Sequence, residues 1–381
     1  NVNSNWTISL TAGTLNLSSY QLSTGRNITG SAGFVLNGNS GTIGSGGSGG
    51  TDFTNITFNP GTSTVYIAYF STDYLYPGSN YFYNVTLIGG LGYMNINTSK
   101  NIMGTLNVLN NLTIQSNCCY QTAPGEAPVN FNGTVTVGGT FSATGKSITN
   151  RLLINGSTIA AAATSLTYVD INVSSVSGGA SWSGTSLGAA GPCVGMSPTT
   201  PKTVYWNLAA GGDWMGATAW ATTSGGAPSL NNFPLPQDTA IIQDTGLTSG
   251  NTITAGTARC ILPNVDFSTR TASMTFSNTA SVYCSGNFTL DANVTVSGTS
   301  GITWLNTSSL TSAGVTLTMP LSIGGYATLT TADALTTSST LTNNGTLNLG
   351  ANAAFTTLAL NGTTGLSTYT LTGTTCTLGA A

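Results

Sequence analysis

The sequence has 381 residues, of which only seven are basic and ten acidic, so 4% of the chain is charged where an ordinary soluble domain has about a quarter. It contains no histidine, which excludes nucleophile triads that depend on that residue, and seven scattered cations are too few to follow a nucleic-acid backbone. Intrinsic disorder is excluded as well, because 40% of the residues are hydrophobic and the net charge is only −3.

The chain has no stretch that could insert into a membrane. A spanning helix needs roughly 20 apolar residues, and the longest run of small residues, IAAAAT at 159–164, is far shorter. The chain also opens at Asn1 without a methionine or a signal peptide. This start suggests a processed protein or a piece of a longer one.

The N-terminal half repeats short segments. FTNITFNPG at 53–61 returns as FYNVTLIGG at 82–90, and GTLNVLNNLTI at 104–114 returns at the same offset as GTVTVGGTFSA at 133–143. These segments contain Gly or Asn turns and alternating apolar and polar residues, the pattern of a strand with one buried face. Each copy is therefore predicted to be one layer of a stack.

A cluster of tyrosines lies between the two copies of the first repeat pair and runs into the second copy. Residues 65–83, VYIAYFSTDYLYPGSNYFY, contain six tyrosines in nineteen positions. Exposed tyrosines stack on sugar rings or form protein contacts as rigid amphipathic anchors. The candidate ligand-binding residues are Tyr69, Tyr74, Tyr76 and Tyr81. The alternatives are a buried aromatic coil with a packed loop, and a seam between subunits.

A change in composition divides the chain into two modules. Residues 178–203 show little alternation and hold three prolines, which predicts a linker or cap. An N-terminal solenoid module is predicted at 1–177 and a second module at 204–381. The second module opens with three tryptophans that are predicted to form a hydrophobic plug sealing the end of its coil: Trp206, Trp214 and Trp220.

Three Thr-Leu-Thr triplets recur at even spacing near the C-terminus, at 316–318, 328–330 and 340–342. Their leucines are predicted to point inward and their threonines outward, and two such strands would make a coil of about 24 residues. A flat threonine array would also order water, as an ice-binding surface does. Ser, Asn and Ala replace threonine in neighbouring coils, which argues against that use.

The predicted fold class is all-β. Gly, Ser, Thr and Asn dominate, and no segment has the apolar spacing of three and four that a helix needs. A parallel β-helix, or β-solenoid, of two stacked modules and an array of β-sandwiches both fit short strands separated by turns. The long repeat offset and the recurrence of Asn and Thr at matching positions favour the β-solenoid, because like side chains form ladders along a stack.

Two parts of the chain carry a resemblance. VYWNLAAGGDWMGATAWATTSGGAP at 204–228, with PLPQDTAII at 234–242, resembles a module of phage and environmental bacterial surface proteins. FYNVTLIGG and GTLNVLNNLTI are similar to the strand repeats of secreted bacterial adhesins and virion fibres. The resemblance implies a right-handed parallel β-helix outside the cell. In the resembling module the strand after the proline usually carries further acidic residues, whereas this chain has only Asp238 and Asp244 there. This difference argues against a calcium site in this chain.

The carboxylates give little support to catalysis. Glycoside hydrolysis needs two of them roughly 5 to 10 Å apart. Asp238 and Asp244 are the closest pair in sequence but could equally cap turns, while a solenoid could bring Asp52 and Asp73 together across coils. No phosphate-binding or dinucleotide fingerprint is present. We predict no enzymatic activity and no cofactor.

The six cysteines do not form a metal-binding motif. They include no CxxC pair, and no histidine is available, so no metal site is predicted. The adjacent Cys118 and Cys119 could form disulfides, or the cysteines could act as small buried hydrophobes.

Together these features predict a non-enzymatic structural and adhesive component of an extracellular fibre, most simply a virion tail fibre. Its predicted partners are host-surface glycans or neighbouring subunits, and self-association is expected because open strand edges at the ends of a stack need caps. The alternatives are a secreted bacterial adhesin or surface-filament subunit and, in a different class, a polysaccharide-degrading tailspike.

Overall fold

The computed structural model describes residues 2–4, 7–24, 27–45, 50–69, 73–89, 100–116, 125–216, 218–255, 259–349, 353–360, 368–371 and 376–378. Within them the chain is nearly all β and forms a β-solenoid of about 14 turns, with a short 3-10 helix, η1 (Leu230–Asn232). The predicted β-solenoid is confirmed. The sandwich alternative is wrong, because the sheets are built almost entirely from parallel strands stacked coil on coil.

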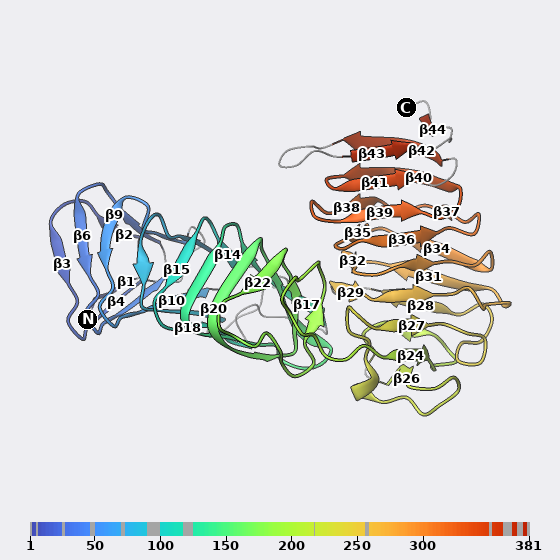
Figure 1. Cartoon of the computed structure of the whole chain (residues 1–381), viewed down its shortest axis with the longest axis horizontal. Helices are drawn as coiled ribbons and strands as arrows, with labels where there is room; N and C mark the ends of the chain where they lie inside the picture. The colour runs from blue at the N-terminus through green and yellow to red at the C-terminus, as the bar shows by residue number, and fades with distance from the viewer. Residues whose placement is uncertain are drawn as a thin grey trace. The chain divides into compact units, whose positions relative to one another are not determined.

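The chain divides into two compact units. Unit 1 comprises Asn1–Thr122, Ala127–Leu187 and Cys193–Thr199, and unit 2 comprises Ala123–Glu126, Gly188–Pro192 and Thr200–Ala381. In each unit the coils stack along one axis (Figure 1). The described residues hold no helix with the length and hydropathy of a membrane span.

Unit 1 is three-sided, because successive strands join three parallel sheets in turn. We call these sheets faces a, b and c. Face a contains β1 (Val2–Ser4), β4 (Gln21–Thr24), β7 (Thr42–Ser45), β10 (Thr64–Tyr69), β13 (Asn84–Gly89), β16 (Leu112–Ile114) and the second halves of β18 (Val135–Thr144) and β20 (Thr158–Thr167). Face b contains β2 (Ile8–Leu10), β5 (Ile28–Gly30), β8 (Thr51–Asp52), β11 (Asp73–Tyr76), β14 (Lys100–Ile102), β17 (Gly125–Phe131), β19 (Asn150–Asn155) and β21 (Val169–Asn172). Face c contains β3 (Thr14–Asn16), β6 (Phe34–Asn37), β9 (Ile56–Asn59), β12 (Tyr81–Phe82), β15 (Leu106–Val108), the first halves of β18 and β20, and β22 (Ser175–Ser177).

Unit 2 repeats this plan on faces d, e and f, after the short strand β23 (Gly188–Ala189). Face d contains β24 (Thr203–Trp206), β26 (Trp220–Ala221), β27 (Thr239–Ile241), β30 (Asn264–Asp266), β33 (Phe288–Thr289), β36 (Ser308–Thr311), β39 (Thr328–Thr331), β41 (Thr346–Leu349) and β43 (Thr368–Leu371). Face e contains β25 (Gly212–Asp213), β28 (Thr252–Ala255), β31 (Met274–Asn278), β34 (Val294–Gly298), β37 (Thr316–Leu317), the first halves of β40 (Leu335–Asn343) and β42 (Ala353–Leu360), and β44 (Cys376–Leu378). Face f contains β29 (Cys260–Leu262), β32 (Val282–Cys284), β35 (Ile302–Trp304), β38 (Leu321–Ile323) and the second halves of β40 and β42.

The prediction that two strands make one coil is wrong, because each coil has three sides. Leu329 faces Leu347 on the following coil, and the three Thr-Leu-Thr triplets lie on β37, β39 and β40, one on each face of unit 2. The inward direction of their leucines is confirmed, since Leu317, Leu329 and Leu341 are at most 2% exposed. The triplets therefore do not form one flat threonine array.

The two pairs of sequence repeats differ in their structural meaning. The second pair lies in register, with Leu106 opposite Val135 and Leu112 opposite Phe141, as predicted for successive layers. The first pair does not, because Ile56 lies on face c and Val85 on face a. Coils are shorter in this part of unit 1, where Thr64 faces Asn84, so the offset between the first two copies spans more than one coil.

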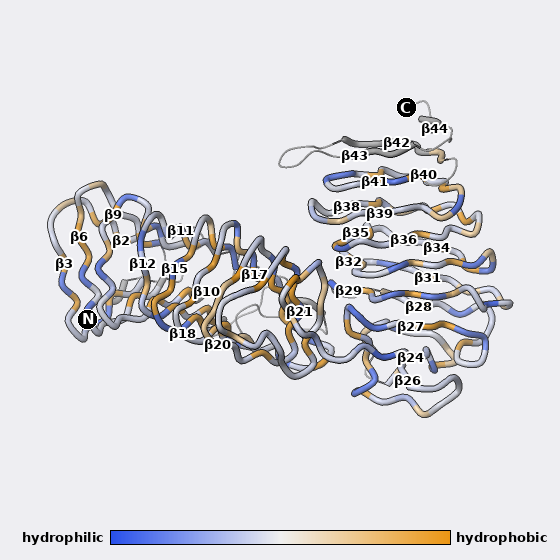
Figure 2. The backbone as a smooth tube through the Cα atoms, in the orientation of Figure 1, coloured by the Kyte–Doolittle hydropathy of each residue, from blue (hydrophilic) through white to orange (hydrophobic). Residues whose placement is uncertain are grey.

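Apolar and polar residues alternate along the strands (Figure 2), and the apolar side chains are buried within each unit. On face b the outward positions form an asparagine ladder, in which each side-chain amide donates to the asparagine of the preceding coil. The Nδ2–Oδ1 distances are 2.8 Å from Asn130 to Asn101, 2.8 Å from Asn155 to Asn130 and 3.0 Å from Asn172 to Asn155. The predicted stacking of like side chains is confirmed for this row.

The segment after β22 packs onto the last coils of unit 1. Trp182 is 3% exposed, its ring lies 5.7 Å from that of Phe141, and its Nε1 donates to the carbonyl of Ser177 at 2.9 Å. These contacts make residues 178–187 an ordered part of unit 1, in which a large ring covers apolar side chains that the last coil would otherwise expose.

Candidate functional site

The three tryptophans at the start of unit 2 form one buried cluster. Trp206 and Trp220 face each other across the antiparallel pair β24–β26, with ring centroids 5.2 Å apart, and Trp214 packs 4.6 Å from Trp220. Each is at most 1% exposed, and the indole N–H groups of Trp206 and Trp220 donate to the carbonyls of Leu208 and Trp214. The structure thus places all three inside unit 2, where they cannot contact a ligand.

Much of the scarce charge is held inside the coils. Arg151 and Asp170, each 1% exposed, form an ion pair with Nε 2.6 Å from Oδ2. Lys202 Nζ lies 2.6 Å from Asp238 Oδ2, and Asp238 is fully buried. Arg270 is buried and donates to the carbonyls of Gln243, Leu247, Ala272 and Ser273. These charges hold loops in place, and the outer faces are left mainly with hydroxyls and amides.

The carboxylates that the structure describes are engaged in local structure. Asp52, Asp213, Asp266 and Asp291 each accept a backbone N–H from the residue two positions on, the geometry of an Asx turn. Asp238 accepts the N–H groups of Lys202 and Leu235, and Asp244 accepts those of Thr271 and Ala272. The turn-capping interpretation of Asp238 and Asp244 is confirmed. The register sets Asp52 beside Tyr76 rather than beside Asp73, whose side chain lies outside the described residues.

The hydrogen bonds that Asp244 accepts from Thr271 and Ala272 predict that this loop of unit 2 is sensitive to acid. The Thr271 hydroxyl, then the N–H groups of Thr271 and Ala272, and the Arg270 charge lower the pKa of Asp244, while burial opposes them. A lowered folded-state pKa stabilises the fold above the unfolded pKa, and this stabilisation is lost as the pH falls through the folded value. We expect the urea midpoint to fall below about pH 4 in wild type and to fall less in Asp244→Asn. Equal acid sensitivity of the two proteins in urea titrations at about pH 7 and about pH 3 would contradict this role.

The described cysteines behave as small buried hydrophobes. Cys193, Cys260 and Cys284 are buried, and burial raises the pKa of Cys284 to about 12. The side chains of Cys118, Cys119 and Cys376 lie outside the described residues. Within the part of the chain that the structure describes, no group of three or more Cys, Asp or Glu side chains is placed to bind a metal ion.

The four candidate tyrosines lie on three faces of unit 1. Tyr69 is on β10 of face a, and its side chain lies outside the described residues. Tyr81 is on β12 of face c and is 54% exposed. Tyr74 and Tyr76 lie two residues apart on β11 of face b, on either side of the fully buried Leu75. The four therefore do not share one face, and among the three whose side chains the structure describes, Tyr74 and Tyr76 are brought together.

Tyr74 and Tyr76 form a stacked, half-buried pair. Their ring centroids are 6.0 Å apart with an interplanar angle of 21°. In register, Tyr74 faces Asn101, the first residue of the asparagine ladder, and Tyr76 faces Asp52 on the preceding coil. The aromatic core of this region consists of Phe53, Phe58 and Phe82, whose centroids are 5.0 to 5.5 Å apart. The tyrosine pair is thus an outward feature beside a row of amides.

Face e of unit 2 presents two rows of hydroxyl side chains, which sequence reasoning missed. In register, one row contains Thr252, Thr275 and Thr295 and the other Thr254, Ser277 and Ser297. On the next coils Thr316 faces Thr336, and the Thr318 hydroxyl bonds to the carbonyl of Val296. The residues between the rows point inward and are buried: Ile253, Phe276, Val296, Leu317 and Thr337. Successive members of a row are one coil apart, and the coils differ in length, so the rows do not appear as a fixed period in the sequence.

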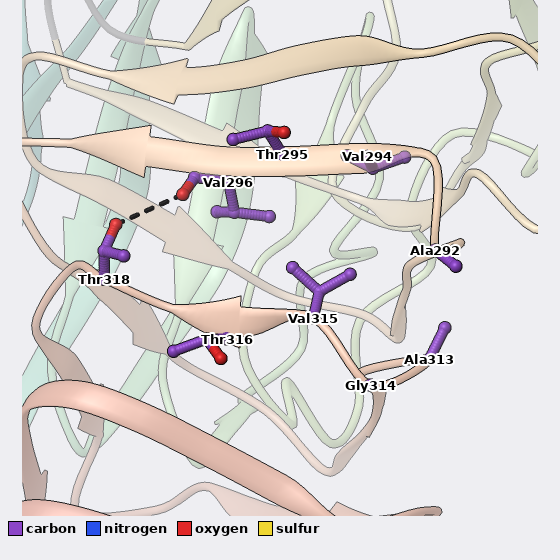
Figure 3. Close-up of a pocket in the computed structure, with 9 residues that line it drawn as sticks. All are labelled: Ala292, Val294, Thr295, Val296, Ala313, Gly314, Val315, Thr316 and Thr318. Carbon is purple, nitrogen blue, oxygen red and sulfur yellow. Dashed lines mark hydrogen bonds between the residues drawn. The ribbon is translucent and has the colours of Figure 1, made fainter.

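A groove opens across these rows between β34 and β37 (Figure 3). It has a volume of about 310 Å³ and is lined by Ala292, Val294, Thr295, Val296, Ala313, Gly314, Val315, Thr316 and Thr318. Val296 and Val315 point toward each other across the gap, and the Thr318 hydroxyl donates to the carbonyl of Val296 at 3.1 Å (Figure 3). The lining contains no charged side chain.

The fold and these surfaces define the chain as a three-sided parallel β-solenoid with largely uncharged outer faces. No known protein-family model, curated protein or solved structure matches it. The resemblance of its segments to adhesin and virion-fibre repeats therefore stays a prediction.

Proposed function

We propose that this chain is a non-enzymatic structural and adhesive component of an extracellular fibre, as in a virion tail fibre, and that it contacts surface glycans or neighbouring subunits through outward side chains. The observation that carries the proposal is the stacked Tyr74–Tyr76 pair beside an asparagine ladder on face b. Rings of this kind stack on the apolar faces of sugars, and amides hydrogen-bond to sugar hydroxyls.

The architecture supports a structural role. Each coil contacts mainly its neighbours, so a stack extends in one dimension and repeats the same outward positions along its length. The Arg151–Asp170 and Lys202–Asp238 ion pairs use charged side chains for internal contacts, so few charged groups remain at those outward positions. Such a support holds ligand-binding side chains on rigid strands rather than on loops.

Replacing the tyrosine pair tests the adhesive part of this function. We expect Tyr74→Ala/Tyr76→Ala to raise the Kd for a bound glycan about tenfold or more, equivalent to about 1.4 kcal/mol, because both stacking faces are lost. The measurement is binding of the full chain to an array of bacterial capsular and lipopolysaccharide glycans. Tyr74→Phe/Tyr76→Phe should retain most of the affinity, since the rings remain.

Tyr20→Ala is the matched control, because Tyr20 is 60% exposed in unit 1 away from the pair. Its affinity and melting temperature should match those of wild type. A parallel loss of affinity and thermal stability in the double alanine variant would contradict a binding role and indicate packing instead. Shortened glycan chains after incubation with wild type would contradict the non-enzymatic assignment.

A further inference from the structure

The groove on face e lies where the sheet is interrupted. β34 is the last strand of the ladder β25-β28-β31-β34, whereas β37 pairs with β40. Among the described strands no backbone ladder joins β34 to β37, and the Thr318 hydroxyl bonds to the Val296 carbonyl across the gap. Two strand edges thus face each other across an open groove, and strand edges present backbone N–H and C=O groups to whatever lies beside them.

The chemistry of this groove is polar and neutral. Thr295, Thr316 and Thr318 are exposed at its rim, and Val315 and Ala313 are partly exposed between them. Hydroxyls both donate and accept hydrogen bonds, and Val315 and the neighbouring alanines supply apolar contact, since Val294 and Val296 are only 2% exposed. A ligand that is rich in hydroxyls, carries C–H surface and has no charge matches this lining.

These properties favour one ligand class over a protein partner. The cores of protein interfaces are enriched in aromatic residues, Met and Arg, and the groove has none of these. An acidic or sulfated polymer would find no cation in the lining to pair with. Hydroxyl side chains continue on both sides of the groove, at Ser277 and Ser297 before it and at Thr336 after it.

We propose that the face e groove is a binding site for a chain of uncharged glycan, which lies along β34 and β37 with its hydroxyls bonded to the threonine rim and the strand edges. The site is distinct from the tyrosine pair of unit 1, and it rests on the proposed adhesive function by giving that function a ligand class. An open groove suits an extended polymer that is held by many weak contacts along its length.

Blocking the groove tests the inference. The probe is a panel of uncharged glucans, mannans and galactans, with dextran sulfate as the charged counterpart of dextran, and binding to the full chain is measured by biolayer interferometry. We expect wild type to bind at least one uncharged polymer and to bind dextran sulfate no better than dextran. Thr316→Tyr, which places a ring at the rim, should raise the Kd about tenfold or more.

The matched control is Thr330→Tyr, because Thr330 is an exposed threonine on β39 of face d. It should leave the affinity unchanged. If Thr316→Tyr melts below wild type, Thr295→Val, which removes a rim hydroxyl but keeps the side-chain shape, replaces it. Equal affinity in wild type and both rim variants would overturn the inference, as would a change in oligomeric state in place of a change in glycan affinity.

The outcomes also separate this site from the proposed function. If adhesion depends on Tyr74 and Tyr76 but no uncharged glycan binds, the groove inference is contradicted and the proposed adhesive function is supported. A protein that binds uncharged glycans through the rim, with no effect of the tyrosine variants, supports the groove and contradicts the role of the tyrosine pair.

Discussion

Leu329→Asp will abolish the cooperative melting of unit 2. Leu329 is fully buried on β39, with Ser308 and Leu347 as its neighbours in register. An ionised carboxylate at this place would be buried without a charged partner among these neighbours, at a cost comparable with the whole stability of about 5 to 15 kcal/mol that a domain has. Thermal unfolding followed by circular dichroism measures the loss.

The neighbouring residue gives the control for this substitution. Thr330 follows Leu329 on the same strand but is exposed, so Thr330→Asp should change the free energy of unfolding by no more than about 0.5 kcal/mol. If the two aspartate variants melt at the same temperature, the assignment of inward and outward positions on face d is wrong.

Breaking the buried ion pair of unit 1 will have the second largest effect. In Asp170→Leu the Arg151 guanidinium stays buried and keeps its bonds to the carbonyls of Val169 and Ser186 but loses its carboxylate. Removing one partner of such a pair typically costs about 3 to 5 kcal/mol. Urea unfolding of the full chain should show this as a lower midpoint for unit 1.

The double variant Arg151→Met/Asp170→Leu tests the reason for that loss. Replacing both charges by apolar side chains of similar size is often nearly neutral, because no unpaired charge remains. We therefore expect the double variant to recover most of the stability that the single variant loses. A double variant as unstable as Asp170→Leu would show that packing, and not the unpaired charge, controls this position.

The direction of side chains could be predicted from the sequence, but the number of sides per coil could not. Alternation identifies Leu317, Leu329 and Leu341 as inward residues, since a strand places every second side chain on one face. A corner, where the chain turns from one face of a coil to the next, does not interrupt that alternation. β18 is one continuous strand whose register shifts between Val137 and Thr140, so it serves two faces. The alternation therefore predicts one side of a coil where β18 in fact contributes to two.

The candidate sites were harder to predict because they depend on which strands share a face. The tyrosines at 65–83 are close in sequence, yet the corners distribute them over three faces, and the described ring contact among them joins Tyr74 and Tyr76. The opposite holds on face e, where Thr275 and Thr295 are adjacent in register although a whole coil of sequence separates them. Because other coils have other lengths, such rows escape any search for a fixed period.

The burial of so many ionic groups has a consequence for the medium in which this protein works. Dissolved salt weakens attraction between exposed charges that lie further apart than about 10 Å at about 0.1 M, and it acts much less on pairs inside a protein. Arg151, Asp170 and Asp238 are almost entirely enclosed, and the hydroxyls and amides outside carry no net charge to screen. The surface binding proposed for this chain should therefore have nearly the same affinity at low and at high salt concentration.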